Sequence, residues 1–455
     1  MTLADICNCP TSLTDTRAVA AWNGVVHGIL SHGRTTGDHL TDLLRIEPEF
    51  AMGHAMKGLA CLMLGRRELM ETAKSASAEA QRCLSLGGAL ERERLWCAAL
   101  QDWLAGKPTA SIARMEEALR LNPADTISMK LSHGIRFMLG DGTGMLRSVE
   151  RALPAHGPDH GLYGYVLGCH AFALEETGQY DRAERQGLRG LQFARDDAWG
   201  LHAVAHVYDM THLTDQGIAL IDSNAAAWDH CNNFRFHVWW HKALLHLDQG
   251  DIATVLDLYD TKVRDEKTDD YRDISNATSL LMRLEIEGID VGNRWAELAD
   301  LAEARTDDGC LTFADMHYML ALIGEDRADA AARMTARVAR DAGPADDTSV
   351  VMMTPGLATS EGLAAFGDAN YGSAFAHLAR AQPDFQAMGG SHAQRDIFER
   401  LTIEAGLRAG RVDETKALLH ARTALRGGQE DSFAASRMAQ IAKMQSVTPA
   451  STAAE

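Results

Sequence analysis

Helical periodicity runs through almost the whole chain, and one segment has the complete pattern of two helices joined by a turn. Within residues 95–125, the small residue Ala99 stands in the first helix and Gly106 at the turn. Pro123 follows the apolar stripe of the second helix and ends the unit, because proline cannot continue a helix. Alternating apolar and polar runs, which predict strands, are nearly absent. The sequence therefore predicts an all-α fold.

Related units recur along the chain, which indicates a repeat architecture. They occupy residues 177–191, 247–260, 367–384 and 408–422. The unit described above ends in the pattern A-L-x-L-x-P at residues 118–123, which resembles the tetratricopeptide consensus. One such unit cannot bury its apolar face alone, so neighbouring units must stack. We expect an α-solenoid of tetratricopeptide-like helix-turn-helix repeats that forms a right-handed superhelix with a concave inner surface.

The predicted superhelix covers residues 1–445 as a single domain. Residues 341–356 interrupt the helical pattern, and we expect a loop there that crosses a groove or caps one end. Residues 446–455 are small and polar, which predicts a disordered tail.

The charge balance and the N-terminal sequence narrow the classes of partner. The formal net charge is -19, from 63 acidic and 44 basic residues, which opposes binding to nucleic acid or to an anionic membrane. The chain begins without the basic and apolar segments of a signal peptide, and no apolar run has the length of a membrane span. Its eight cysteines follow no disulfide framework. We therefore expect a cytoplasmic protein with reduced thiols, which could form a homo-oligomer.

Two pairs of histidines share the spacing of the repeats. His202 and His206 are four residues apart on one predicted helix, and His237 and His241 are four apart on another. The second pair follows the first by 35 residues, which is about one repeat length. The pairs should thus lie at equivalent positions on neighbouring first helices, whose axes are roughly 8–10 Å apart. We expect the four imidazoles to lie within one small area.

Further polar and aromatic residues stand on the same predicted helices or on a late helix that could face them. We expect catalytic candidates at Asp273, His317, His392 and Arg395 beside the four histidines, and ligand-binding candidates at Trp199, Trp240, Arg272, Asn276, Tyr318 and Gln394. Arg272 and Asn276 follow the second histidine pair by another 35 residues, which is the reason for including them.

Three interpretations of the histidines stay open. Two H-x3-H pairs could supply metal ligands such as those of zinc, but neither pair has the glutamate of an H-E-x-x-H motif. Without a metal, the imidazoles could act as an acid or a base, or could bind a polar ligand. They could also simply be hydrogen-bonded packing residues. The sequence assigns no cofactor.

Three stretches also resemble one particular family. DDAWGLHAVAHVYDM (residues 196–210), NFRFHVWWHKALLHLDQGD (233–251) and GGSHAQRDIFE (389–399) are similar to the tetratricopeptide repeat protein 38 family. The resemblance runs along nearly the whole chain and implies an α-solenoid, without implying an activity.

The expected function is the binding of a small polar ligand or a peptide in a concave groove lined by histidine and tryptophan. The alternative is an enzyme of the hydrolase or lyase type that uses the histidine cluster, with or without a bound metal. A third hypothesis is a homo-oligomeric structural protein.

Overall fold

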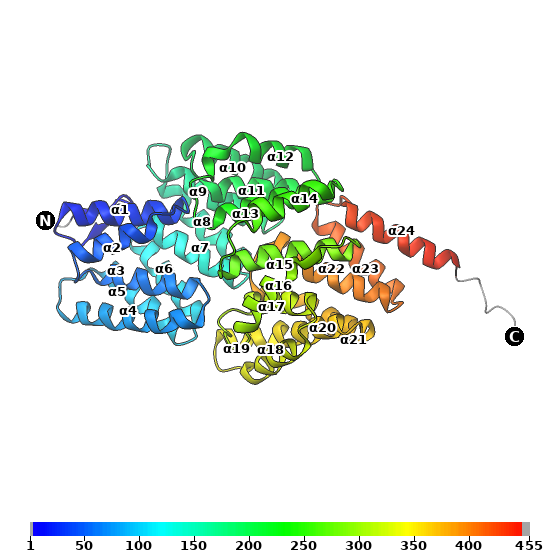
Figure 1. The fold of residues 1–455 in the computed structure, drawn as a ribbon. Helices are drawn as coiled ribbons and strands as arrows, with labels where there is room; N and C mark the ends of the chain where they lie inside the picture. The colour runs from blue at the N-terminus through cyan, green and yellow to red at the C-terminus, as the bar shows by residue number, and fades with distance from the viewer. Residues whose placement is uncertain (1–2, 448–455) are drawn as a thin grey trace.

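The computed structural model describes residues 3–447 and confirms an all-α solenoid (Figure 1). A small hairpin of β1 (Leu3–Ala4) and β2 (Pro10–Thr11) precedes the helices. The first part of the chain then contains α1 (Thr16–Leu30), α2 (Thr36–Ile46), α3 (Ala51–Met63), α4 (Arg67–Ser85), α5 (Glu91–Leu104), α6 (Pro108–Leu121), α7 (Thr126–Met138), α8 (Gly142–Ala152) and the short η1 (Leu153–Ala155).

The central part continues the pairing of a first helix with a second helix that turns back along it. It contains α9 (Tyr163–Glu175), α10 (Tyr180–Phe193), α11 (Ala198–Met210), α12 (Thr214–Ser223), η2 (Ala225–Ala227), α13 (Phe234–Asp248), α14 (Ile252–Leu258), η3 (Tyr259–Val263), α15 (Tyr271–Ile286), η4 (Gly292–Arg294) and α16 (Trp295–Ala304). The first helices α9, α11, α13 and α15 contact one another in sequence and form an inner layer.

The last part of the chain folds back toward that inner layer. It contains α17 (Thr312–Gly324), α18 (Ala328–Asp341), α19 (Asp347–Val351), η5 (Met352–Gly356), α20 (Leu357–Gly367), α21 (Tyr371–Ala381), η6 (Gln382–Met388), α22 (His392–Arg408), α23 (Val412–Leu425) and α24 (Ser432–Val447). Helix α22 lies against both α11 and α15. None of the helices in residues 3–447 is long and apolar enough to cross a membrane.

Two boundaries differ from the sequence prediction. Residues 341–356, expected to be a loop, contain α19 and η5. Long-range contacts stabilise α19, because the backbone N–H and the hydroxyl of Thr109 both donate to Asp347, at 2.9 and 2.6 Å. At the other end, α24 continues to Val447, two residues into the predicted tail. The remainder of that tail, residues 448–455, lies outside the described residues.

Two of the inner helices, α9 and α11, are enclosed on all sides, and this changes the expectation of an open groove. Every residue of α9 and of α11 is buried, whereas their partner α10 is buried at only three positions. The two inner helices cross at a pair of glycines: a Cβ added to Gly168 would lie 3.0 Å from the Cα of Gly200. The two helices approach closely at this crossing because glycine has no side chain. The close approach leaves no groove between them, and side chains fill the rest of the interior.

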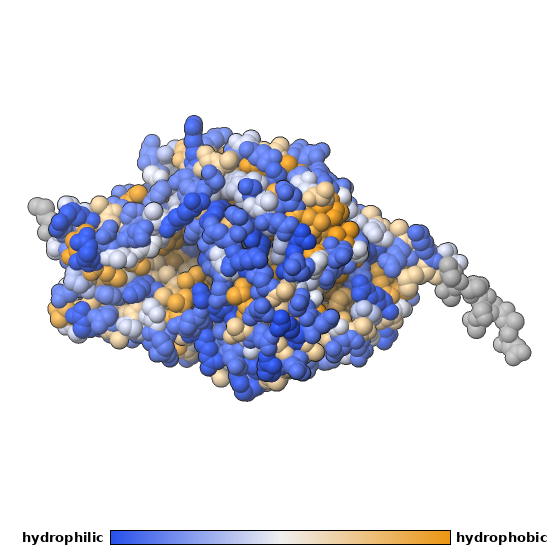
Figure 2. Space-filling view, viewed as in Figure 1, coloured by the Kyte–Doolittle hydropathy of each residue, from blue (hydrophilic) through white to orange (hydrophobic). Residues whose placement is uncertain are grey.

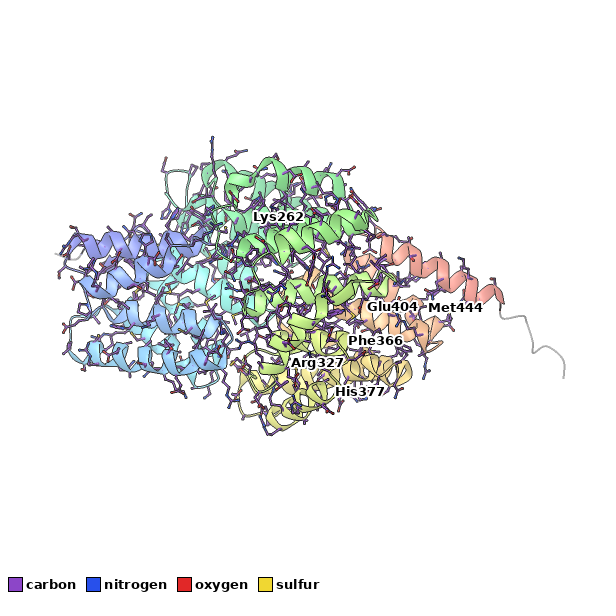
Figure 3. All side chains as sticks on the ribbon, viewed as in Figure 1. Lys262, Arg327, Phe366, His377, Glu404 and Met444 are labelled. Atoms are coloured by element: carbon purple, nitrogen blue, oxygen red, sulfur yellow. The ribbon has the colours of Figure 1, made fainter. Side chains whose placement is uncertain are left out.

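Contacts between distant repeats close the solenoid on itself. The guanidinium of Arg34, after α1, donates to the carbonyl of Cys231, before α13, at 2.8 Å. Figure 2 shows a mostly hydrophilic face with a recess between the N-terminal helices and the central ones. At the opposite end, the carboxylate of Glu404 in α22 accepts from Arg437 of α24 at 2.7 Å, and side chains fill the spaces between the layers (Figure 3).

Candidate functional site

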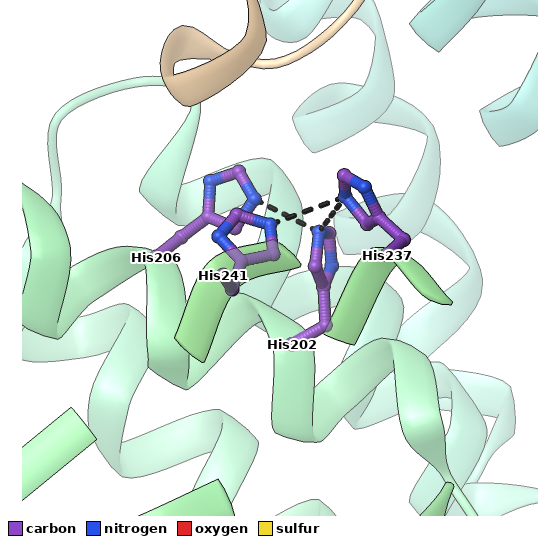
Figure 4. A group of neighbouring side chains, drawn as sticks. All are labelled: His202, His206, His237 and His241. Atoms are coloured by element: carbon purple, nitrogen blue, oxygen red, sulfur yellow. Dashed lines mark hydrogen bonds between the residues drawn. The ribbon is translucent and has the colours of Figure 1, made fainter. Parts of the chain in front are cut away.

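The four histidines of the repeat-spaced pairs converge inside the molecule (Figure 4). His202 and His206 lie on α11, while His237 and His241 lie on α13. The Nε2 atom of His202 lies 2.8 Å from that of His206 and 3.0 Å from that of His237. The Nε2 atom of His241 lies 3.1 Å from that of His237. One ligand atom from each ring thus falls within 4.8 Å of the other three.

Burial changes the protonation of these rings. The exposed fractions are 2% for His202, 0% for His206, 9% for His237 and 2% for His241. Burial lowers the pKa of His202 and of His241 well below the ordinary value, and lowers the pKa of His237 to about 3. Three of the four rings are therefore neutral near pH 7, which is the state in which imidazole binds a metal.

His206 is the exception, and the cause is a neighbouring carboxylate. Burial is the largest single effect and acts to lower the pKa of His206, but the carboxylates of Glu175, Glu176 and Asp209 together outweigh it and raise the pKa, with Glu175 contributing most. An oxygen of Glu175 lies 3.5 Å from Nδ1 of His206. Glu175 is completely buried, and neither of its oxygens has a hydrogen-bond partner within residues 3–447. A buried carboxylate in such surroundings requires a nearby positive charge.

Two of the rings have partners that turn their Nε2 atoms toward the centre. Nδ1 of His237 lies 2.8 Å from the side-chain oxygen of Asn276, and with the amide in this orientation Nδ1 carries the proton. The Nε2 atom of His237 therefore presents a lone pair. On His206, the corresponding partner is the negative charge of Glu175, 3.5 Å from Nδ1, without a hydrogen bond. Oxygen partners on the far nitrogen are a regular feature of metal-binding histidines.

Aromatic rings surround the cluster and exclude water. Phe172 of α9 stacks on His202, with centroids 5.5 Å apart and planes at 17°. Trp240 stacks on His237, at 5.2 Å and 16°. Because each of these two imidazoles stacks on an aromatic ring, its rotation is restricted, which keeps its nitrogens directed at the centre.

The late helix α22 closes one end of the cluster. Glu176, next to Glu175, accepts from the backbone N–H of His392 at 2.8 Å and from the guanidinium of Arg395 at 3.1 Å. Glu175, Glu176 and His206 form a second group of close ligand atoms. Gln394 does not reach this group, because its side chain accepts from the N–H of Ser391 and caps α22.

Other candidate residues have partners elsewhere. Asp273 accepts from the amide of Asn233 at 2.6 Å, and Arg272 pairs with Asp270. The ring of His317 bonds the carbonyl of its own helix four residues earlier and packs on Phe313 and Phe398. Tyr318 is also buried on α17. The structure does not bring Asp273, His317 or Tyr318 into contact with the four histidines.

Sequence reasoning missed Glu175, Glu176 and Phe172. They lie on or just after α9, where no repeat offset connects them with the histidines. Their place beside His202 and His206 follows from the close crossing of α9 and α11, for which the glycines at the crossing are the only local signal.

A well-defined cavity lies away from the cluster. It has a volume of about 340 Å³ and lies between α15, α22 and α24. Its arginines are already paired: Arg426 binds Asp209, and Arg400 binds Asp396 and Asp431. Because these charged groups are already paired, the cavity has fewer polar groups free to bind a ligand than the histidine cluster has.

Comparison with known proteins concerns the architecture alone. No family model matches the chain. The human IFIT1 dimer with m7Gppp-AAAA is 12% identical, with 87% of this chain and 90% of that chain covered and a TM-score of 0.40. Yeast Tom70 is 12% identical, with 95% and 92% covered and a TM-score of 0.36. The P58(IPK) TPR domain is 11% identical, with 79% and 100% covered and a TM-score of 0.23.

These neighbours leave the more specific expectations open. The resemblance to the tetratricopeptide repeat protein 38 family stays a prediction. So do the cytoplasmic location, the homo-oligomer and the expectation that the chain binds neither nucleic acid nor membrane.

Proposed function

We propose that this solenoid is a metal-binding protein whose four-histidine cluster holds one divalent transition-metal ion of the zinc class. The observation that supports this proposal most strongly is the convergence of four Nε2 atoms, with contacts of 2.8–3.1 Å, in a buried space. Tetrahedral zinc with bonds of about 2.0–2.1 Å separates its nitrogen ligands by about 3.3 Å. The three contacting pairs therefore need to open by only a few tenths of an ångström to accept an ion, and the ligand atoms of all four rings lie within 4.8 Å of one another.

The positions of the protons on the ring nitrogens favour a bound metal over a cluster held by hydrogen bonds alone. If His206 is protonated, its Nε2–H points at His202, whose Nε2 must then be an acceptor. His237 also presents a lone pair from Nε2, because its Nδ1 donates to Asn276. Two lone pairs would then face each other at 3.0 Å. If His206 is neutral instead, the buried Glu175 has no positive charge beside it. A metal ion removes both difficulties, since four lone pairs then point at a cation.

The ligand set favours binding over catalysis. Structural zinc sites use four protein ligands, whereas catalytic sites retain an open position. Four histidines can fill the coordination sphere, so a hydrolase or lyase is the weaker alternative. The enclosed inner helices also favour a small ligand over a peptide in the His/Trp-lined interior.

Metal content tests the proposal directly. The protein is purified without a histidine tag, incubated with Zn²⁺, dialysed, and assayed for metal by mass spectrometry. We expect about one equivalent per chain. Substitution of Co²⁺ should produce the intense visible absorption of a tetrahedral site.

His241→Ala removes one ligand, and His317→Ala is the matched control. Both residues are buried histidines on inner helices, but His317 lies outside the cluster. His241→Ala should bind metal at least about tenfold more weakly, and His317→Ala should bind like wild type. Wild type that retains far less than one equivalent, or two variants with equal metal content, would overturn the proposal.

A further inference from the structure

The cluster has one end that is closer to solvent. His237 is the most exposed of the four histidines, at 9%, while His206 at the opposite end is fully buried behind Glu175 and the α22 contacts. On the His237 side, Phe234 and the partly exposed Arg272 lie at the N-terminal ends of α13 and α15. The approach to the cluster therefore runs along the N-terminal ends of the inner helices.

Lys130, on the neighbouring inner helix α7, is an unusual residue on this side. It is only 7% exposed. Every buried arginine in residues 3–447 has a carboxylate within 4.0 Å, for example Arg92 with Asp5 and Asp125. Lys130 is the one buried lysine or arginine side chain of that range without such a partner. Buried charges are normally paired, so the ammonium of Lys130 lacks an anion.

Asp197 is an acidic group whose pKa the charge of Lys130 acts to lower, but it does not form an ion pair with Lys130. No oxygen of Asp197 comes within ion-pair distance of the ammonium, and its Oδ2 has no hydrogen-bond partner within the described residues. Burial raises the pKa of Asp197 to about 7, so about half of these carboxyls are neutral at neutral pH. The two groups thus lie in one buried region without neutralising each other.

Flat rings connect Lys130 with the histidine cluster. The ammonium lies 4.5 Å from the centroid of Trp199, whose indole N–H donates to His133 at 3.2 Å. Trp199 lies 5.1 Å from the ring of His202. His32, from the turn between α1 and α2, stacks on Trp199 at 5.7 Å and on Phe234 at 4.3 Å. Its own Nε2 has no partner within residues 3–447.

We propose that Lys130, Trp199, Phe234 and His32 form a binding site for a small anion that carries a flat apolar group. The carboxylate or phosphate of such a ligand pairs with the ammonium of Lys130, and its flat part packs on the rings of Trp199 and Phe234. The inference rests on the proposed metal centre in one respect, because the ligand then lies beside His202 and His237, which hold the metal.

His32 is suited to admit the ligand. It lies in the turn between α1 and α2, outside the inner helices, and has a positive φ of 58°. A ligand ring could take its place against Phe234 and near Trp199, whose own rings lie 5.7 Å apart, while the inner helices stay unchanged.

Isothermal titration of the metal-loaded full chain tests the site with two probes. Benzoate and phenyl phosphate share the flat ring and differ in the anion, while inorganic phosphate tests the anion alone. We expect millimolar or tighter binding of at least one aryl probe and weaker binding of inorganic phosphate. Lys130→Met should weaken the aryl probe by about tenfold or more, and Lys130→Arg should retain most of the affinity.

Lys262→Met is the matched control. Lys262 also lies over an indole, with its ammonium 5.5 Å from the centroid of Trp239, but it is exposed (Figure 3). This variant should bind the probes like wild type. Lys130→Met should also melt at a higher temperature than wild type without ligand, because the substitution removes an unpaired buried charge.

Metal content is measured for each variant, which separates this proposal from the proposed function. Wild type that takes up no metal but still binds the aryl probe through Lys130 contradicts the metal centre and supports the anion site. Metal-loaded wild type that binds no aryl probe at millimolar concentration, or that binds it as Lys130→Met does, overturns the anion site.

Discussion

Glu175→Gln tests whether the buried carboxylate supports the metal centre. The substitution retains the shape of the side chain and removes the charge that lies 3.5 Å from Nδ1 of His206. A metal on the opposite nitrogen of that ring is roughly 7 Å from the carboxylate, if a bond of about 2 Å is added to the ring. At an effective dielectric constant of about 20, a dication at that distance gains about 5 kcal/mol from the charge.

The measured effect should be smaller than this Coulomb energy. The amide that replaces the carboxylate keeps a partial negative charge on its oxygen near Nδ1 of His206. In the wild type without metal, Glu175 is partly compensated by protonation of His206, whose pKa it raises. Carboxylates that orient a ligand histidine typically contribute 10–100-fold to metal affinity, or about 1.4–2.7 kcal/mol. We therefore expect Glu175→Gln to weaken zinc binding by about 10–100-fold.

The assay is competition with a chromophoric chelator, and Glu176→Gln is the neighbouring control. Glu176 pairs with Arg395, so its loss should mainly lower stability. In the absence of metal, Glu175→Gln should melt at a higher temperature than wild type, because a buried charge has been removed. Equal zinc affinities for Glu175→Gln and wild type would refute the role assigned to this carboxylate.

Two further predictions concern acid stability and packing. The pKa of His237 and of His317 falls to about 3 in the folded chain, against about 6.5 when unfolded. The unfolded chain therefore binds protons first, and stability is complete above about pH 6.5 and falls toward pH 3, by up to about 1.4 kcal/mol per pH unit for each histidine. Urea midpoints of metal-free protein at about pH 7.5 and about pH 5.5 check this, and equal midpoints would contradict it. Gly200→Ala places a Cβ 2.4 Å from Asp197 and should cost about 1–3 kcal/mol in the same titration, whereas exposed Gly372→Ala, with open space around it, should be neutral. A Gly200→Ala protein as stable as wild type would contradict the close packing assigned to Gly200.

The repeat period carries much of the information about the site. Two histidine pairs offset by 35 residues predict that four rings meet on neighbouring inner helices, and the structure places them on α11 and α13 with nitrogens in contact. A second step of 35 residues reaches Asn276, which orients His237. This was predictable because stacked repeats place equivalent residues side by side whatever the curvature of the stack.

The surroundings of the histidines depend on contacts that no local pattern encodes. Glu175 reaches His206 because α9 and α11 cross closely, and Arg395 reaches Glu176 only because the chain returns after more than 200 residues. The same return encloses the inner helices, which replaces the expected open groove with a buried cluster. A short-range pattern does not encode the curvature of the solenoid, which is the sum of small rotations between repeats. The sequence by itself therefore determined the helices, their stacking and the meeting of the histidines, while the tertiary structure alone decided their burial, their charge and their route to solvent.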